Sequence, residues 1–446
     1  MGNQCDRVFE NYSSAIEPSA GDRVKTDRFV LSYCYKIPLP YIKDPIAYIR
    51  IVSMTDTTPT SYDIERAVLD RYQAGAQQVE ASLCCPTEYD TRYLDILPEE
   101  ILEKDYGCGD PSRYVNPSET VVDLGSGAGK ICYVLSQKVG ATGRVIGVDF
   151  NDTMLALARK YQTEISNKIG YQNVDFVKGK IQDLALNLDK LQTWLDAHPV
   201  KTLEDLAALE SERDRLRRED PAIPDNSVDV VVSNCVLNLV RPQDKQQLFQ
   251  EIFRVLKRGG RAVISDIVCD ETPTKKILDN PELWSGCISG AFREDGFLEM
   301  FEEAGFYGVE ILSRQEEPWQ VIDGIEFRSM TVRAYKGKDG ECWERNRAVV
   351  YKGPWKQVLD DDGHAYHRGQ RMAVCDKTFQ ILTASKSPYR NDVIPILPYQ
   401  EIPLDKAKKF DCKRSSVRSP QETKGANYRE THTNDVPVCG DGAGCC

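Results

Sequence analysis

The feature that most constrains the fold of this chain is a glycine-rich turn at residues 123–129. A short apolar segment at 119–124 leads into the turn, and apolar residues recur at helical spacing over 131–138 after it. The turn therefore joins a strand to a helix, which is the arrangement at the start of a βα unit. Chains that begin in this way fold as α/β domains, with further strands to complete the sheet.

Four more apolar segments of strand length follow, and helical patterns separate them. They lie at 144–149, 174–177, 228–233 and 261–265. Strands that alternate with helices predict a parallel, doubly wound, Rossmann-like sheet. The charged, leucine-containing stretch at 183–220 predicts a helical hairpin inserted between the third and fourth strands.

The sequence predicts four regions in all. Residues 1–60 lack a clear pattern and form an N-terminal extension, and residues 61–315 contain the α/β domain with its insertion. Residues 316–403 alternate apolar and polar positions, which predicts a smaller β-rich domain. Residues 404–446 are rich in Lys, Ser, Thr and Asn, a composition that predicts a disordered tail containing cysteines.

Composition excludes several classes of partner. The 446-residue chain has a formal net charge of −12, which argues against broad binding to nucleic acid. No stretch approaches the roughly 18 apolar residues of a membrane helix, and the N-terminus lacks the apolar run of a secretory signal. We therefore expect a cytoplasmic protein that does not associate with membranes, and we expect it to be a monomer.

Fifteen cysteines are an unusual number beside only four histidines. Without a secretory signal these thiols stay mostly reduced. The chain contains no CxxC pair, so a zinc ribbon is excluded. Metal, metalloid or redox chemistry is the expected use of the thiols.

The glycine turn departs from the dinucleotide fingerprint, because Lys130 stands where that fingerprint has its third glycine. A ligand without a pyrophosphate fits better, with an ammonium group near Asp123. Asp149 ends the second strand and can bind both ribose hydroxyls. The pattern resembles class I S-adenosylmethionine-dependent methyltransferases. The candidate cofactor-binding residues are Asp123, Gly125, Ser126, Gly127, Gly129, Asp149, Met154, Ile181 and Asn234. Met154 and Ile181 could instead be ordinary core residues.

The methyl acceptor is indicated by the cysteines, because no histidine falls in a strand-end loop of this domain. Soft thiolates select soft metals and, by extension, trivalent arsenic. Four cysteine contexts in order, together with the last two residues of the chain, resemble the arsenite methyltransferases. These contexts are Tyr106–Gly109, Asp123–Ser136, Val232–Leu239, Trp284–Cys287 and Cys445-Cys446.

The resemblance implies functions for Cys108, Cys132, Cys235 and Cys287. Cys235 and Cys287 would bind trivalent arsenic, delivered as a thiol complex, near the methyl group of S-adenosylmethionine. Cys108 and Cys132 would join a disulfide relay that returns arsenic to the trivalent state, and Cys132 could be a third thiolate ligand. Glutathione or thioredoxin would reset the thiols. Cys84-Cys85 could take up arsenic.

Two other functions stay open at this point. The first is methyl transfer to a small organic acceptor, and the second is sequestration of arsenic or heavy metal on a degenerate methyltransferase fold. Each cysteine could also be a small buried apolar residue. We expect structural roles for Cys269, Cys342 and Cys375, and we assign no role to Cys412.

Overall fold

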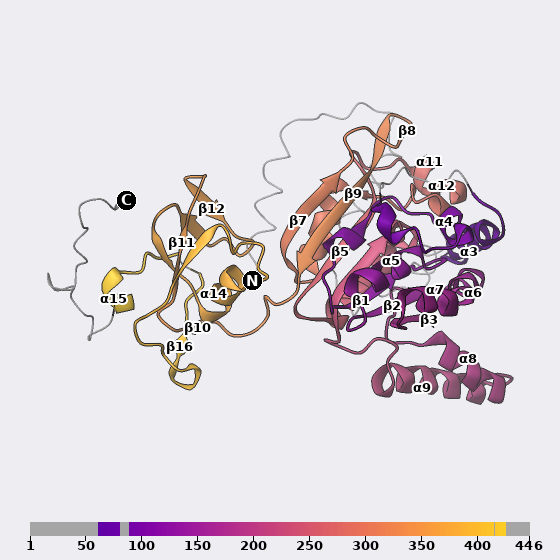
Figure 1. Ribbon diagram of the computed structural model, residues 1–446, viewed down its shortest axis with the longest axis horizontal. Coiled ribbons are helices and arrows are strands. Elements are labelled where there is room, and N and C mark those ends of the chain that lie inside the picture. The colour runs from indigo at the N-terminus through magenta and orange to yellow at the C-terminus, as the bar shows by residue number, and fades with distance from the viewer. Residues whose placement is uncertain (1–60, 81–88, 414, 425–446) are drawn as a thin grey trace, which may run out of the picture. The chain divides into compact units, whose positions relative to one another are not determined.

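The computed structural model describes residues 61–80, 89–413 and 415–424 (Figure 1). The N-terminal extension, the Cys84-Cys85 pair and the terminal cysteines lie outside these residues, so arsenic uptake by Cys84-Cys85 stays a prediction. No helix within the described ranges combines the length and apolar character needed to cross a membrane.

The core of the catalytic region is one nine-stranded sheet in the order β3-β2-β1-β4-β5-β9-β7, with β6 paired to β5 and β8 paired to β9. Strands β1 to β6 pair in parallel, whereas β9 pairs antiparallel with β5, β7 and β8. The strands are β1 (Thr120–Leu124), β2 (Arg144–Asp149), β3 (Val174–Lys178), β4 (Val228–Asn234), β5 (Leu256–Cys269), β6 (Phe292–Arg293), β7 (Tyr307–Arg314), β8 (Gln320–Ile322) and β9 (Ile325–Tyr335).

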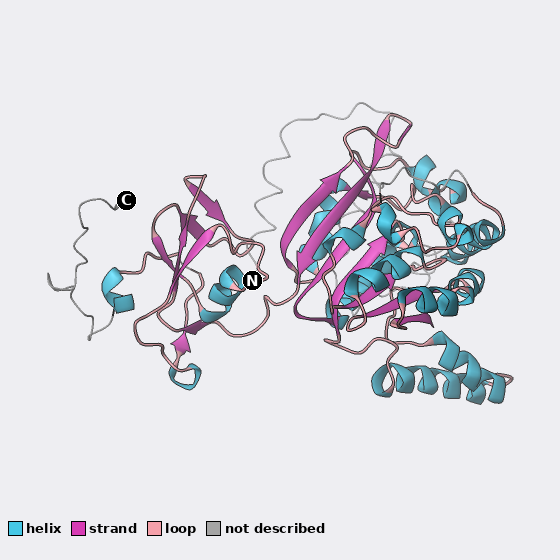
Figure 2. Cartoon of the chain, in the orientation of Figure 1, coloured by secondary structure: helices cyan, strands magenta, loops and turns pink. Residues whose placement is uncertain are grey.

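Helices cover both faces of this sheet (Figure 2). Successive side chains of a strand point to opposite faces, so Val121 packs in the apolar core under α5, whereas Val122 packs in the core under α10. This double coverage confirms the predicted doubly wound domain. The helices are α3 (Ser61–Gln77), α4 (Glu99–Glu103), α5 (Lys130–Val139), α6 (Asp152–Lys160), α7 (Gln162–Ile169), α10 (Pro242–Val255), α11 (Lys275–Leu278), α12 (Pro281–Ser285) and α13 (Glu294–Glu303).

The leucine pattern at 183–220 forms two helices, α8 (Leu188–Ala197) and α9 (Leu203–Glu219), between β3 and β4. Thr202 and Asp205 form a reciprocal capping box at the start of α9, which fixes where this helix begins. Leu191 and Leu216 pack together between the helices, while most other positions of α9 are exposed.

The smaller C-terminal domain is β-rich, as the sequence predicts. Its strands are β10 (Trp343–Glu344), β11 (Ala348–Tyr351), β12 (Gln357–Leu359), β13 (Ala365–His367), β14 (Arg371–Ala373), β15 (Val393–Ile396) and β16 (Lys408–Lys409), and its helices are α14 (Asp376–Thr383) and α15 (Pro420–Lys424). The strands form three small antiparallel sheets, and the apolar core of the domain includes Val349, Tyr366 and Phe379.

Two predicted boundaries are wrong. The domain boundary at residue 315 falls too early, because β9 pairs with β5 along its length and so belongs to the central sheet. The sheet is therefore mixed rather than wholly parallel. An alternating strand at an antiparallel sheet edge has the same sequence pattern as a strand in a separate β domain, so the pattern could not distinguish the two. The tail boundary at 404 also falls too early, because β16 and α15 lie beyond it.

Candidate active site

A pocket opens where the strand order reverses, between the carboxyl ends of β1 and β4. Parallel pairing aligns Asp123 with Val232 and Leu124 with Ser233, so the loops after the two strands begin side by side. Open α/β sheets bind ligands at this switch point. All of the predicted cofactor-binding residues except Gly129 line the pocket.

The glycine turn is shaped by close backbone packing. A Cβ atom on Gly125 would lie 2.4 Å from Cγ1 of Val236, and the residue has a φ of +68°. Gly129 precedes α5 with a φ of +87°, and a Cβ atom there would lie 2.9 Å from Cζ of Phe176. Only glycine meets both demands at these positions. Gly129 therefore serves the turn's packing, since it does not line the pocket.

Two buried polar atoms beside the pocket have no hydrogen-bond partner among the described residues. They are Oγ of Ser126 and Nδ2 of Asn151. Both residues line the pocket, and the Oδ1 atom of Asn151 already caps α6 by accepting from Thr153 and Met154. Buried polar groups without partners are costly. Because both residues line the pocket, a small rotation of each side chain would bring these atoms to a polar ligand, so the residues fit a bound cofactor.

The carboxylates of the pocket favour a cationic, hydroxyl-rich ligand. Burial raises the pKa of Asp123 to about 7, although the thiol of Cys132 partly opposes the rise. Burial also raises the pKa of Asp149, against the effect of backbone N–H groups of Asn151 and Gly127. The Gly127 and Asn151 N–H groups donate to Asp149 at 2.8 Å each. A cation beside Asp123 would favour its ionised form.

Three thiols meet at one end of this pocket. Cys235, which also lines the pocket, follows β4 and interacts with both Cys108 and Cys287. All three are buried in one apolar cluster, and Sγ of Cys287 donates to the carbonyl oxygen of Cys235 at 3.2 Å. The neighbouring thiols and burial hold the pKa of Cys235 well above its usual range, and burial likewise raises that of Cys108. The unliganded thiols of Cys108 and Cys235 are therefore protonated.

Cys235 and Cys287 both adopt left-handed backbone conformations, with φ values of +63° and +64°. Such values are uncommon outside glycine and cluster at functional sites. The carboxylate of Asp266 holds the loop after Cys235 by accepting from the N–H groups of Leu237 and Asn238. The fold thus holds the backbone of Cys235 and Cys287 in a strained conformation, which directs the two thiols differently from an extended backbone.

Asn234 positions the third thiol. Its Oδ1 atom accepts from the N–H groups of Cys108 and Gly109 at 2.9 and 3.0 Å, and its Nδ2 atom donates to the Gly109 carbonyl. A Cβ atom on Gly107 would lie 2.1 Å from Nδ2, so glycine is required there. The side chain predicted to bind the cofactor thus also fastens the Cys108 loop to the end of β4.

The structure does not bring Cys132 to the other three thiols. It lies in the first turn of α5, in the core on the opposite face of the sheet from α10, and its Sγ atom donates to Asp123 at 3.2 Å. Burial and Asp123 raise its pKa well above the usual value. The predicted relay role of Cys132 is untested by this arrangement.

Sequence reasoning missed Tyr72 and Asp266. Tyr72 lines the pocket from α3, and its hydroxyl lies 3.9 Å from Sγ of Cys287. No local pattern links a helix so far upstream to this site. Asp266 follows the apolar core of the fifth predicted strand, and an acidic residue at that position was a usable signal.

Comparison with known proteins identifies the family. A methyltransferase domain model matches residues 116–222 and 214–305. The mouse (Mus musculus) arsenite methyltransferase is 31% identical over 307 residues, which span 66% of this chain and 71% of the mouse protein. The human (Homo sapiens) arsenite methyltransferase is 30% identical over 310 residues, 66% of this chain and 72% of that protein. This chain belongs to the arsenite methyltransferase family.

Two further similarities describe this family member. The crystal structure of an arsenic(III) S-adenosylmethionine methyltransferase from Chlamydomonas reinhardtii matches with a TM-score of 0.48 and 24% identity, over 75% of this chain and 100% of that chain. A domain of unknown function matches residues 338–428, which contain the C-terminal β-rich domain.

The role of Asn234 in this family member leads to a testable prediction. Asn234→Ala removes the acceptor for two backbone N–H groups of the Cys108 loop, which costs about 1–3 kcal/mol. Local opening of that loop then rises, and Cys108 reacts roughly 5- to 150-fold faster with iodoacetamide. Mass spectrometry of timed alkylation measures the rate.

Asn173→Ala is the matched control, because the Asn173 amide makes similar bonds, but to Ser136 and Gly140 instead of the Cys108 loop. Alkylation of Cys108 at the wild-type rate in both variants would contradict the positioning role of Asn234.

Proposed function

We propose that this enzyme transfers methyl groups from S-adenosylmethionine to trivalent arsenic held by Cys235 and Cys287, giving methylated arsenicals. The observation that carries the proposal is the meeting of three buried thiols at one end of a pocket suited to that cofactor. Membership of the arsenite methyltransferase family supports the same donor and the same acceptor.

S-adenosylmethionine, when bound, supplies an electrophilic methyl group on a sulfonium. Asp123 would accept the amino group and Asp149 the ribose hydroxyls, while Oγ of Ser126 and Nδ2 of Asn151 would gain partners. Met154 and Ile181, both buried, would form apolar walls. The Gly125–Gly129 turn would let the backbone approach closely.

Protonated thiols suit a substrate that arrives as a thiol complex. The cysteine protons pass to the departing carrier thiols as the arsenic–sulfur bonds exchange, so no net charge enters the buried site. The lone pair of trivalent arsenic is then the nucleophile, and the transfer requires no general base. The rate would come mainly from proximity and orientation, which the strained backbone at Cys235 and Cys287 secures.

Methylation formally oxidises arsenic by two electrons, so a reductant must return it to the trivalent state. Two thiols that join as a disulfide supply those electrons and release two protons. Cys108 interacts directly with Cys235 and is the better placed donor, whereas Cys132 lies beside Asp123. Glutathione or thioredoxin would then reduce the disulfide. We further propose that the enzyme is a cytoplasmic monomer.

Replacing the proposed arsenic ligands separates binding from catalysis. Cys235→Ser and Cys287→Ser are each expected to abolish arsenite methylation, because a hydroxyl is too hard a ligand for arsenic. S-adenosylmethionine affinity should stay within about threefold of wild type, since each change replaces one atom. Chromatographic arsenic speciation and calorimetry measure the two properties.

Cys269→Ser is the matched control, because Cys269 is buried in the same apolar cluster but donates to the carbonyl of Phe292 instead of joining the three thiols. Wild-type turnover in Cys235→Ser or Cys287→Ser would overturn the assignment of these ligands.

The raised pKa of Asp123 predicts pH-dependent cofactor binding. Below pH 7 the unliganded carboxyl is protonated, and an ammonium group beside it requires the carboxylate, so binding there releases a proton. Affinity for S-adenosylmethionine should therefore fall by up to about tenfold for each pH unit below 7. Asp123→Asn should bind more weakly and lose that slope.

Calorimetry at several pH values, with buffers of different ionisation enthalpy, measures both the affinity and the proton release. The same slope in Asp123→Asn as in wild type would show that another group titrates.

A further inference from the structure

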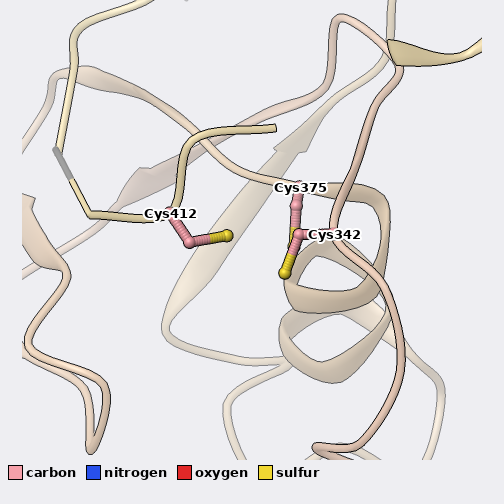
Figure 3. A group of neighbouring side chains, drawn as sticks. All are labelled: Cys342, Cys375 and Cys412. Atoms are coloured by element: carbon pink, nitrogen blue, oxygen red, sulfur yellow. The ribbon is translucent and has the colours of Figure 1, made fainter. Parts of the chain in front are cut away.

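Three cysteines of the C-terminal β-rich domain lie together, separate from the residues of the active site. The Sγ atoms of Cys342, Cys375 and Cys412 all lie within 4.8 Å of one another. Figure 3 shows the Cys412 side chain directed toward the other two. All three are free thiols, and Cys375 is buried while the other two are partly buried. We propose that these thiols form a second site that binds trivalent arsenic.

Pairing between strands distant in sequence positions two of the three cysteines, Cys342 and Cys412. Strands β10 and β16 pair antiparallel, with Trp343 opposite Lys409, and the N–H of Phe410 donates to the carbonyl of Cys342 at 2.8 Å. This pairing brings Cys342 and Cys412 together although 69 positions separate them in the sequence. The strand pair therefore fixes the distance between these two sulfurs.

Helix α14 positions the third cysteine. Cys375 is its N-cap residue, and its Sγ atom accepts from the N–H of Thr378 at 3.3 Å. The hydroxyl of Thr378 lies 3.1 Å from the same sulfur. These two contacts orient the sulfur of Cys375 before any ion binds.

A partly buried histidine holds the Cys412 segment. Nε2 of His364 donates to the carbonyl of Cys412 at 2.8 Å, and Nδ1 donates to Asp360 at 2.9 Å. The hydroxyl of Tyr366 also donates to Asp360. Asp360 raises the pKa of His364, which favours the form that donates from both nitrogens. A small cavity lined by His364, Cys375 and Cys412, among others, adjoins the thiols.

The sulfur spacing fits one central ion. With bonds of about 2.3 Å, three sulfurs around a zinc-sized centre lie about 4 Å apart, which small side-chain rotations reach from the observed positions. Within the described ranges, the group that could hold an ion contains these three cysteines and no fourth ligand. A three-coordinate thiophilic centre therefore matches the site better than tetrahedral zinc.

Charge also favours trivalent arsenic. Arsenous acid and three thiols exchange to give one tris-thiolate complex and three water molecules, with no change in charge or oxidation state. Zinc would require the release of three protons and would leave a net negative charge. Burial and the neighbouring thiols raise the pKa of Cys412, which favours the neutral form of that thiol.

The test measures arsenic stoichiometry on the reduced full-length chain. Arsenite is titrated into the protein, the free arsenic is removed, and bound equivalents are counted by mass spectrometry. Cys375→Ser and Cys412→Ser are each expected to lose one equivalent relative to wild type, while Cys269→Ser loses none. Serine is a favoured N-cap residue, so Cys375→Ser keeps α14 capped while it removes the soft ligand.

Cys235→Ser distinguishes the two sites, because it should lose the equivalent bound at the active site and keep the one in the C-terminal domain. The double variant with Cys375→Ser should lose both equivalents. Methylation of excess arsenite should be unchanged in Cys375→Ser. Because the arsenic count requires no methyl transfer, it tests the C-terminal site even if the proposed function fails. Equal arsenic content in wild type, Cys375→Ser and Cys412→Ser would overturn the second site. So would bound zinc that arsenite does not displace.

Discussion

The reversal of strand order between β1 and β4 is the constraint on which the active site depends. Chain segments that follow these strands must emerge side by side at the carboxyl edge of the sheet. One of these segments is the glycine turn, and the other begins with Cys235, directly after Asn234 at the end of β4. A pocket that borders a cluster of thiols is therefore a direct consequence of the topology. Asn234 extends the arrangement, because its amide fastens the Cys108 loop to the same sheet edge.

Burial sets the electrostatic character of this site. It raises the pKa of Asp123 and Cys108 and contributes to the high pKa of Cys235, so the unliganded pocket has less negative charge than its residue types suggest. A cation beside Asp123 and a neutral arsenic complex at the thiols would both suit such a site. The net charge of −12 is consistent with a substrate that is not a polyanion. The same reasoning applies to Cys412 in the C-terminal domain, where neighbouring thiols and burial also favour the protonated form.

The sequence predicts what depends on local pattern and on parallel sheet geometry. The five parallel strands, the glycine turn and the place of Cys235 after β4 all follow from such patterns. Cys108 and Cys287 could be associated with Cys235 only through the family resemblance, because loops distant in sequence bring them there. The same limit explains why Cys342, Cys375 and Cys412, expected to be structural or without a role, meet in space: a strand pair and a helix cap join them. Strand β9 was misplaced because its alternation suits either domain.

The most direct test of the central claim is the fate of the methyl group in the wild-type enzyme. The protein is incubated with arsenite, a thiol reductant and S-adenosylmethionine labelled with carbon-13 in the methyl group, and the arsenic products are separated and identified by mass spectrometry. The arrangement of Cys235 and Cys287 beside the pocket predicts labelled methylarsenicals that form with enzyme-dependent turnover. Saturating binding of S-adenosylmethionine without any labelled arsenical would contradict the account.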